Sequence, residues 1–541
     1  MPATETENKK VDNGRSQVLR AAGLMSIAVL LSRVVGLVRD MVTLNYLGTE
    51  TLEANAYAVA SRFPEAIFLI VAGGAIGSAF IPTFSAYFVR DDEPGAWRLF
   101  SSVINLITLV VTGIAILAAV FAAPLIEFFY GDQIALAPEL LPLTVSLMRV
   151  MLLSTIIFAA SGVIMGALNA RQHFLLPALA PTIYNLGIIA GAVLWVQPDA
   201  GPTQGKAMGL AVGTVIGALG HFLVQLPGLA QKKAHYEPIV TVRDPGVIQV
   251  LKLMAPRVLG LSFSEINKFI ILFLTGTAVM ALGSLPAINT AFRIINLPLG
   301  ILGLALGVAA FPTLATLAAR QALDDMRVII TDSLRLLLFL GLPITVLLML
   351  LSEPIITILF ERGLFDAEST NFASLALFYL SLGLIALMML EVIARSFYAL
   401  SDTLTPVLAG GVQIVIMAGL SLWLSLVVFP GRGLLPLGGL ALGFSLSNYF
   451  EVALLLWLLR RKMGRLEGRA LLDGGIRMGL AAGVMTAVTL FTLSLIPASP
   501  WWHLLAGSAA GGAAYLLACA LLRVKELGQF VAYGRRRLGG G

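Results

Sequence analysis

Long apolar stretches, separated by short polar breaks, make up almost the whole chain. We count fourteen of them, and most reach or exceed the roughly 20 residues that a helix needs to cross a bilayer. The apolar positions are continuous and do not alternate with polar ones, which argues against membrane-spanning strands. The pattern therefore predicts an all-α polytopic membrane protein with 14 transmembrane helices.

The expected spans follow one another closely along the sequence. They lie at about 18–47, 55–88, 97–129, 140–170, 174–196, 206–229, 247–275, 281–318, 325–360, 369–400, 405–429, 436–459, 470–496 and 501–522. A polar tail at 1–17 precedes the first span, and a basic tail at 525–541 follows the last.

The chain repeats part of its own pattern. Landmarks recur 229 or 230 residues later at four places: Pro82 and Pro312, Gly73/Gly77 and Gly303/Gly307, Pro124 and Pro354, and Pro177 and Pro406. The repeated unit has six spans, so both copies enter the membrane with the same polarity. We therefore expect two six-helix lobes, at 18–230 and 247–462, related by an axis along the membrane normal and enclosing a cavity. The repeated glycines are expected to allow close helix packing.

Two further segments complete the expected organisation. A polar loop at 231–246 connects the two lobes, and residues 463–524 add two helices, the thirteenth and fourteenth, outside the repeat.

Basic residues gather on one side of the expected membrane. They fill the N-terminal tail, the loops that lead from even to odd spans, the connector at 460–469 and the C-terminal tail, whereas the opposite loops hold only Lys206, Arg362 and Arg432. By the positive-inside rule, both termini are expected in the cytoplasm. The formal net charge of +6 then reflects topology, and nucleic-acid binding is not expected.

Composition supports this class and argues against several others. Hydrophobic residues make up 58% of the chain and charged residues 12%, a charged share far below that of soluble domains. The single cysteine, Cys519, rules out a disulfide framework, and four scattered histidines form no metal-binding pattern. No phosphate-binding loop, His-Glu-x-x-His or Gly-x-Ser-x-Gly motif occurs. We expect no enzymatic activity and no cofactor, with transport driven by the membrane potential or an ion gradient.

Thirteen charged residues lie deep within the expected spans, where each costs about 2.5–3.5 kcal/mol on insertion scales. The bases are Arg33, Arg39, Arg62, Arg149, Arg257, Lys268, Arg293 and Arg395, and the acids are Asp40, Glu65, Glu265, Glu391 and Glu451. Helical spacing predicts three structural ion pairs: Arg62 with Glu65, Glu265 with Lys268, and Glu391 with Arg395. The remaining excess of positive charge favours water or an anionic ligand at membrane depth.

The first span carries charges in its middle. On a helix, Arg33, Gly36 and Asp40 share one face, and Arg39 points about a third of a turn away. We expect this helix to line a polar cavity inside the bundle. Arg33, Arg39 and Arg293 have few nearby acids, and a guanidinium group binds phosphate or pyrophosphate through two parallel hydrogen bonds. These arginines are candidate anion ligands, with buried structural ion pairs as the alternative.

Several motifs resemble those of a known transporter family. The opening Ser32-Arg33-x-x-Gly36-x-x-Arg39-Asp40 resembles the first-helix signature of the MurJ (MviN) lipid II flippases, which belong to the multidrug/oligosaccharidyl-lipid/polysaccharide exporter superfamily. Further matching stretches are Ala79-Phe80-Ile81-Pro82, Phe311-Pro312, Leu359-Phe360-Glu361-Arg362-Gly363 and Phe397-Tyr398-Ala399-Leu400-x-Asp402-Thr403-x-Thr405-Pro406. They span expected helices 1 to 11 in the family's order, and the family also has fourteen helices.

The resemblance implies a function and a location. It implies that lipid II, an undecaprenyl-pyrophosphate-linked disaccharide pentapeptide, moves from the inner to the outer leaflet of the bacterial cytoplasmic membrane by alternating access, as cell-wall synthesis requires. Expected helices 13 and 14 would contribute a groove for the lipid tail. The implied partners are lipid II or a similar polyprenyl-pyrophosphate lipid, membrane lipids and the cell-wall synthesis machinery.

The resemblance also implies roles for individual residues. It implies pyrophosphate binding by Arg33, Arg39, Arg293 and Arg62. Together with the charge pattern, it indicates a set of residues that line or gate the cavity: Ser32, Gly36, Asp40, Glu65, Arg257, Glu265, Lys268, Glu391 and Arg395.

The chain departs from the family pattern at five positions. Phe68 and Gly73 stand where relatives often have an arginine and a glutamate, and Phe292 and Asn296 stand where acids are common. Ile271 replaces the sodium-linked aspartate of some members, so this position offers no carboxylate to a sodium ion.

Three alternatives to lipid II transport stay open. One is a flippase for another polyprenyl-linked glycan, the second is a multidrug or cation antiporter of the same superfamily, and the third is a non-transporting scaffold of the cell-wall machinery. The excess of intramembrane arginine counts against a site for cationic drugs. It also counts against a scaffold, because such charges are costly without a ligand.

Overall fold

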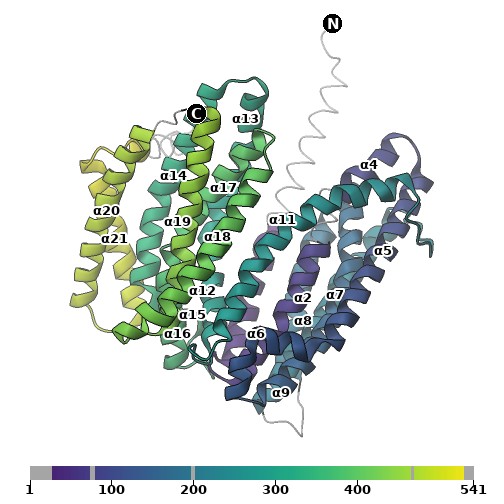
Figure 1. Cartoon of the computed structure of the whole chain (residues 1–541), viewed down its shortest axis with the longest axis horizontal. Coiled ribbons are helices and arrows are strands. Elements are labelled where there is room, and N and C mark those ends of the chain that lie inside the picture. Colours follow the sequence, from purple (N-terminus) through teal and green to yellow (C-terminus); the bar gives the residue numbers. More distant parts are fainter. Residues whose placement is uncertain (1–26, 73–78, 196–201, 465–467, 529–541) are drawn as a thin grey trace. The chain divides into compact units, whose positions relative to one another are not determined.

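The computed structural model describes residues 27–72, 79–195, 202–464 and 468–528 (Figure 1). The expected tail at 1–17, most of the tail at 525–541, and the landmarks Gly73 and Gly77 lie outside these ranges. Packing divides the chain into two compact units, Met1–Gly276 and Thr277–Gly541, and each is described by itself. The helix expected at 247–275 thus belongs to the first unit by packing. The repeat-based division into lobes rests on sequence offsets and stays a prediction.

The described part of the first unit consists of helices joined by turns and by a longer loop between α10 and α11. After a helix at 27–47 follow α2 (Leu52–Ile67), the π-helix η1 (Phe68–Ala72), α4 (Ile81–Val89), α5 (Glu93–Val120), α6 (Ala122–Leu136), α7 (Leu140–Ala170), α8 (Leu175–Leu194), α9 (Pro202–Leu223), α10 (Leu226–Gln231) and α11 (Pro245–Thr275). Helix α7 is central, because it packs against α2, α5 and α9. An aromatic core joins α4 to α5, where Phe84 meets Trp97 edge to face.

The described part of the second unit is also helical. It contains α12 (Ser284–Pro298), the π-helix η3 (Leu299–Leu304), α13 (Ala305–Ala319), α14 (Leu323–Leu350), α15 (Ser352–Phe360), α16 (Ala367–Ser381), α17 (Leu384–Ala399), α18 (Leu404–Trp423), η4 (Leu424–Val428), η5 (Pro430–Arg432), α19 (Pro436–Met463), α20 (Gly468–Leu495) and α21 (Pro500–Leu521). Within the described ranges the only β-type pairing is an isolated bridge between Arg362 and Phe365. The expected all-α fold is confirmed.

Helix boundaries reproduce the internal repeat. Helices α5 and α14 both have 28 residues and begin at positions 93 and 323, and α8 and α18 both have 20 residues and begin at 175 and 404. A π-helical segment follows α2 in the first unit and α12 in the second. Residues with a positive φ follow the ends of corresponding helices. Asp91 follows α4 and Gln321 follows α13, and Gln172 follows α7 and Ser401 follows α17. The repeated proline landmarks therefore reflect a repeated series of elements.

Glycines set the closest helix packing in the first unit. A Cβ atom added to Gly191 of α8 would lie 2.3 Å from the carbonyl oxygen of Gly209 in α9, and one added to Gly187 would lie 2.3 Å from the Cα of Gly217. Side chains there would separate the two backbones. Small residues allow this close approach where lipid provides no hydrophobic driving force between helices.

Several expected spans are not continuous α-helices in the described part of the chain. The span expected at 97–129 breaks at Phe121 between α5 and α6, and the span expected at 325–360 breaks at Leu351 between α14 and α15. Each break lies three residues before a repeated proline, Pro124 or Pro354, which suits the first turn of a new helix. The span expected at 369–400 is bent by 46° between α16 and α17.

The number of membrane crossings is only partly accounted for. In the described part of the chain, ten helices are long and apolar enough to cross a membrane, or eleven if the bent pair is one span. The three other expected spans are the helix at 27–47, the α2–α4 region and α11. These three regions carry most of the intramembrane charges or include residues that the structure does not describe, so they are not among the ten or eleven. The multi-pass architecture is confirmed, and the count of 14 stays a prediction.

Candidate functional site

Arg39 is held in place by two neighbours in the first unit. Its Nε and Nη2 atoms donate to Asp40 Oδ1 at 3.1 and 2.7 Å, and Nη1 donates to Asn185 Oδ1 of α8 at 2.9 Å. Asp40 and Asn185 are each only 7% exposed. The bonds therefore lie within the packed interface between the helix at 27–47 and α8, and they fix the direction of the guanidinium group.

Small residues on the first helix make room for this contact. Asn185 Nδ2 donates to the backbone oxygen of Ser32 at 3.5 Å, and a Cβ atom on Gly36 would lie 3.5 Å from the same nitrogen. The expected cavity residues Ser32 and Gly36 thus lie against the Asn185 amide, and Asp40 is linked to it through Arg39. Sequence reasoning missed Asn185, although an amide next to Tyr184 within an apolar span was an available signal.

Arg33 differs from Arg39. Its side chain is exposed, and among the described residues it has no hydrogen-bond or ion-pair partner. Asp40, which lies near both arginines in sequence, pairs with Arg39. The donors of Arg33 are therefore available for an anionic ligand.

A second charged cluster joins α2 to α11. Arg62 lies 3.5 Å from Glu65, and Lys268 lies 2.9 Å from Glu265, which confirms both predicted i, i+3 pairs. Glu65 also contacts Lys268 at 3.3 Å, so four charges form one chain across the two helices. Arg257, another expected cavity residue on α11, has a side chain outside the description.

Tyr184 connects the two clusters. It precedes Asn185 on α8 and interacts electrostatically with both Arg39 and Glu65. Tyr184 therefore lies near both charged clusters. The clusters contain Arg39, Arg62 and Lys268 with Asp40, Glu65 and Glu265, and Arg33 adds a further positive charge on the first helix.

The second unit holds the remaining expected site residues. Arg293 lies on α12 and is partly buried. Arg395 donates to the backbone oxygen of Glu391 at 2.6 Å and also pairs with the Glu391 carboxylate, which confirms the third predicted ion pair. A Cβ atom on Gly307 would lie 2.8 Å from Arg395 Nη1, so this repeated glycine serves packing, as expected.

Aromatic packing explains two departures from the family pattern. Phe68 contacts Phe158 with ring centroids 5.2 Å apart, and Phe292 contacts Phe444 edge to face at 5.1 Å. Ile271 is buried, with 4% of its surface exposed. Each of these positions fills apolar space and offers no charge to a ligand.

The charged clusters offer hydrogen-bond donors of arginine and lysine and no set of metal ligands among the described residues. No group of three or more His, Cys, Asp or Glu side chains suited to a metal occurs among the residues that the structure describes. The arginines instead offer planar, charge-assisted donors of the kind that bind phosphate oxygens.

A family model described as "Lipid II flippase MurJ" matches residues 44–505. The chain belongs to the MurJ lipid II flippase family. It is 29% identical over 532 residues to a Vibrio cholerae protein named "Probable lipid II flippase MurJ", covering 94% of this chain and 98% of that one. It is also 29% identical over 407 residues to the "Lipid II flippase MurJ" of Burkholderia cenocepacia, covering 74% and 77%.

Solved structures support the same fold. A "Lipid II flippase MurJ, inward closed conformation" aligns with a TM-score of 0.72 at 24% identity, covering 92% of this chain and 98% of that chain. An inward-facing multidrug MATE transporter of the MOP superfamily aligns with a TM-score of 0.68 at 15% identity, covering 81% and 96%. At these identities the likeness concerns the fold alone.

Proposed function

We propose that this protein is a lipid II flippase, which moves undecaprenyl-pyrophosphate-linked muropeptide from the inner to the outer leaflet of the bacterial cytoplasmic membrane. The observation that carries the proposal is the pair of first-helix arginines. Arg39 is fixed by Asp40 and Asn185, and Arg33 is exposed without a partner among the described residues. Family membership supplies the lipid class.

The two arginines have complementary roles in this proposal. The edge of Arg39 formed by Nε and Nη2 is used by Asp40, which leaves part of the guanidinium group as a positioned donor. Arg33 supplies exposed donors and a charge without a partner among the described residues. A pyrophosphate, which carries two adjacent anionic groups, can bind one fixed and one exposed arginine together. Arg293 and Arg62 remain sequence-based candidates for further phosphate contacts.

Orientation and energy source follow from the sequence. The distribution of basic residues supports cytoplasmic termini, so that the first helix runs outward from the cytoplasm. No nucleotide-binding motif occurs in the sequence, and transport would use the membrane potential or an ion gradient. The site would act by binding and alternating access, without enzymatic chemistry, metal or cofactor. Contacts with the cell-wall synthesis machinery belong to the same proposal.

One experiment tests the cargo directly. The gene is expressed in a bacterial strain depleted of its own lipid II flippase, and lipid II in the outer leaflet is measured. We expect rescue by the unmodified protein. Absence of rescue at normal membrane abundance would show that the cargo is another lipid-linked glycan or a different solute.

Variants test the proposed arginines. Arg33→Ala and Arg39→Ala should each lower lipid II transport about tenfold or more, because each loses a charge-assisted contact worth about 1.5–3 kcal/mol. Arg149→Ala is the matched control, since Arg149 Nε donates to the backbone oxygen of Ala119, outside the two charged clusters. If both first-helix variants flip lipid II at the unmodified rate, the assigned pyrophosphate role is wrong.

A further inference from the structure

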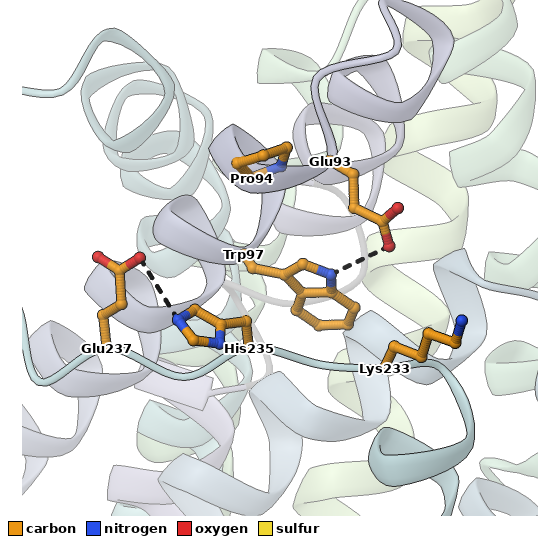
Figure 2. A pocket seen from close by; sticks show the side chains of 6 residues that line it. All are labelled: Glu93, Pro94, Trp97, Lys233, His235 and Glu237. Carbon is orange, nitrogen blue, oxygen red and sulfur yellow. Dashed lines mark hydrogen bonds and ion pairs between the residues drawn. The ribbon is translucent and has the colours of Figure 1, made fainter.

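A cavity outside the charged clusters lies at the start of α5. It has a volume of about 310 Å³ and is lined by Glu93, Pro94 and Trp97 of α5 and by Lys233, His235 and Glu237 of the loop between α10 and α11 (Figure 2). This volume is at the lower end of the range for small-molecule sites, so it suits a compact polar group.

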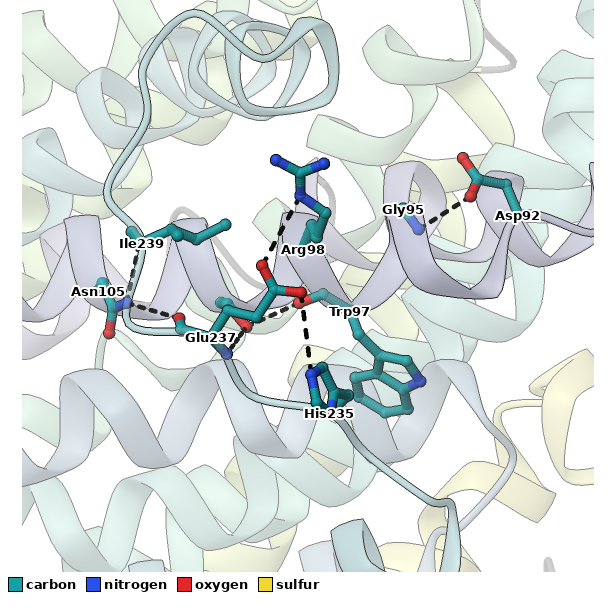
Figure 3. Close-up of polar contacts among 9 residues, drawn as sticks. Asp92, Gly95, Trp97, Arg98, Asn105, His235, Glu237 and Ile239 are labelled. Carbon is teal, nitrogen blue, oxygen red and sulfur yellow. Dashed lines mark hydrogen bonds and ion pairs between the residues drawn. The ribbon is translucent and has the colours of Figure 1, made fainter.

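The loop wall of this cavity is fixed to α5 by hydrogen bonds (Figure 3). The backbone nitrogen of Glu237 donates to Ser101 Oγ at 3.0 Å, and Asn105 Nδ2 donates to the backbone oxygen of Ile239 at 2.9 Å. Tyr236 Oη donates to Asn105 Oδ1 at 2.9 Å. Ser101 is fully buried. The loop is therefore held in place before any ligand arrives, which lowers the cost of ordering on binding.

Some charged side chains of the cavity already have partners within the protein, and others are available to a ligand. The Glu237 carboxylate lies 3.8 Å from Arg98 and 4.0 Å from His235, so it already has partners within the protein. Glu93 accepts only a 3.4 Å hydrogen bond from Trp97 Nε1 among the described contacts. The side chain of Lys233 has no hydrogen-bond or ion-pair partner in the described part of the chain. The cavity thus presents one available anion and one available cation beside an indole ring.

The position of the cavity places it near lipid headgroups. Helix α5 has 28 residues and is therefore about 42 Å long, whereas the hydrocarbon core of a bilayer is about 30 Å thick. The charged residues of α5 lie at its N-terminal end. The part of α5 that extends beyond the hydrocarbon core, about two turns including Glu93 and Trp97, therefore lies at the level of the headgroups. Tryptophan is typical of this interface.

We propose that this cavity binds the headgroup of phosphatidylethanolamine. Its primary ammonium would donate hydrogen bonds to Glu93, its phosphate would accept from Lys233, and its two connecting carbons would lie against Trp97. A phosphatidylglycerol headgroup has no ammonium and repels Glu93. A phosphatidylcholine headgroup has a cation but no N–H donor, so it loses the hydrogen bond to the carboxylate.

Native mass spectrometry of the purified full-length protein with equimolar phosphatidylethanolamine and phosphatidylglycerol tests this proposal. We expect preferential retention of phosphatidylethanolamine, and Glu93→Gln should reduce the ratio of the two bound lipids about tenfold. Lys233→Gln should weaken the retention of both lipids. Glu139→Gln and Lys252→Gln remove exposed charges outside the cavity and should leave the ratio unchanged.

Further arms distinguish other ligands. Equal retention of phosphatidylcholine and phosphatidylethanolamine by the unmodified protein would overturn the proposal, because the ammonium hydrogen bond would then contribute nothing. Soluble phosphoethanolamine that competes as well as the lipid would identify a soluble ligand and overturn the lipid assignment. An unchanged lipid ratio in Glu93→Gln, with unaltered melting temperature, would also overturn it.

Discussion

The hydrogen bond between Asn185 and Arg39 offers the sharpest test of the site. Asn185→Ala removes the acceptor that lies 2.9 Å from Arg39 Nη1 and leaves the bonds to Asp40 intact. Arg39 then keeps its charge but gains side-chain freedom. A ligand must immobilise that side chain again, at a cost of about 0.5–1.5 kcal/mol. We therefore expect an undecaprenyl pyrophosphate lipid to bind about 2- to 13-fold more weakly.

A double-mutant cycle separates this positioning role from a loss of structure. Binding is measured for Asn185→Ala, for Arg39→Ala and for the double variant in lipid nanodiscs. If Asn185 acts through Arg39, removing it should have no effect once Arg39 is absent. Gln413→Ala is the control, because Gln413 is a buried amide on α18, the repeat counterpart of α8, and donates to Ser447 Oγ at 2.9 Å. Equal losses from Asn185→Ala with and without Arg39 would refute the positioning role.

Two further predictions concern stability of the second unit. Burial acts to raise the pKa of Asp402, but hydrogen bonds, including that from Lys462, lower it to about 2. The stability that the ionised Asp402 carboxylate contributes is therefore present above its unfolded-state pKa, near 3.8, and is lost as the pH falls towards 2. Asp402→Asn should therefore lower the melting temperature at pH 7, with a gap to the unmodified protein that narrows below pH 4; a gap independent of pH contradicts this assignment. Gly307→Ala should destabilise by about 1–3 kcal/mol relative to Gly419→Ala, because the added Cβ meets Arg395 and a backbone oxygen, whereas nothing lies within 4 Å of the Gly419 position. Equal melting temperatures would mean that the packing at Gly307 yields without cost.

Local spacing predicted the parts of the fold and site that depend on neighbours in sequence. The pairs Arg62–Glu65, Glu265–Lys268 and Glu391–Arg395 formed as expected because helical geometry alone brings such residues together. The all-α membrane fold followed from the continuous apolar runs in the same way. The contact between Glu65 and Lys268 joins residues 203 positions apart, and no local pattern encodes it.

The helix breaks and Asn185 show where sequence reasoning ended. Phe121 and Leu351 lie within apolar runs, so hydropathy joined the helices on either side, although Pro124 and Pro354 marked the start of a new helix. Asn185 is uncharged and lies 146 positions from Arg39. A search for charges could not select it, because its role depends on the packing of α8 against the first helix.

The two repeated units differ in how they neutralise charge. In the second unit, Arg395 is paired within its own helix and is packed against Gly307, so its charge is balanced locally. In the first unit, Arg39 is balanced by Asp40, but Arg33 has no such partner in the described part of the chain. A repeat of helix boundaries thus coexists with an unequal distribution of available positive charge. Because an anionic headgroup binds where charge is uncompensated, the first helix is the part of the repeat that we expect to dominate contact with the pyrophosphate.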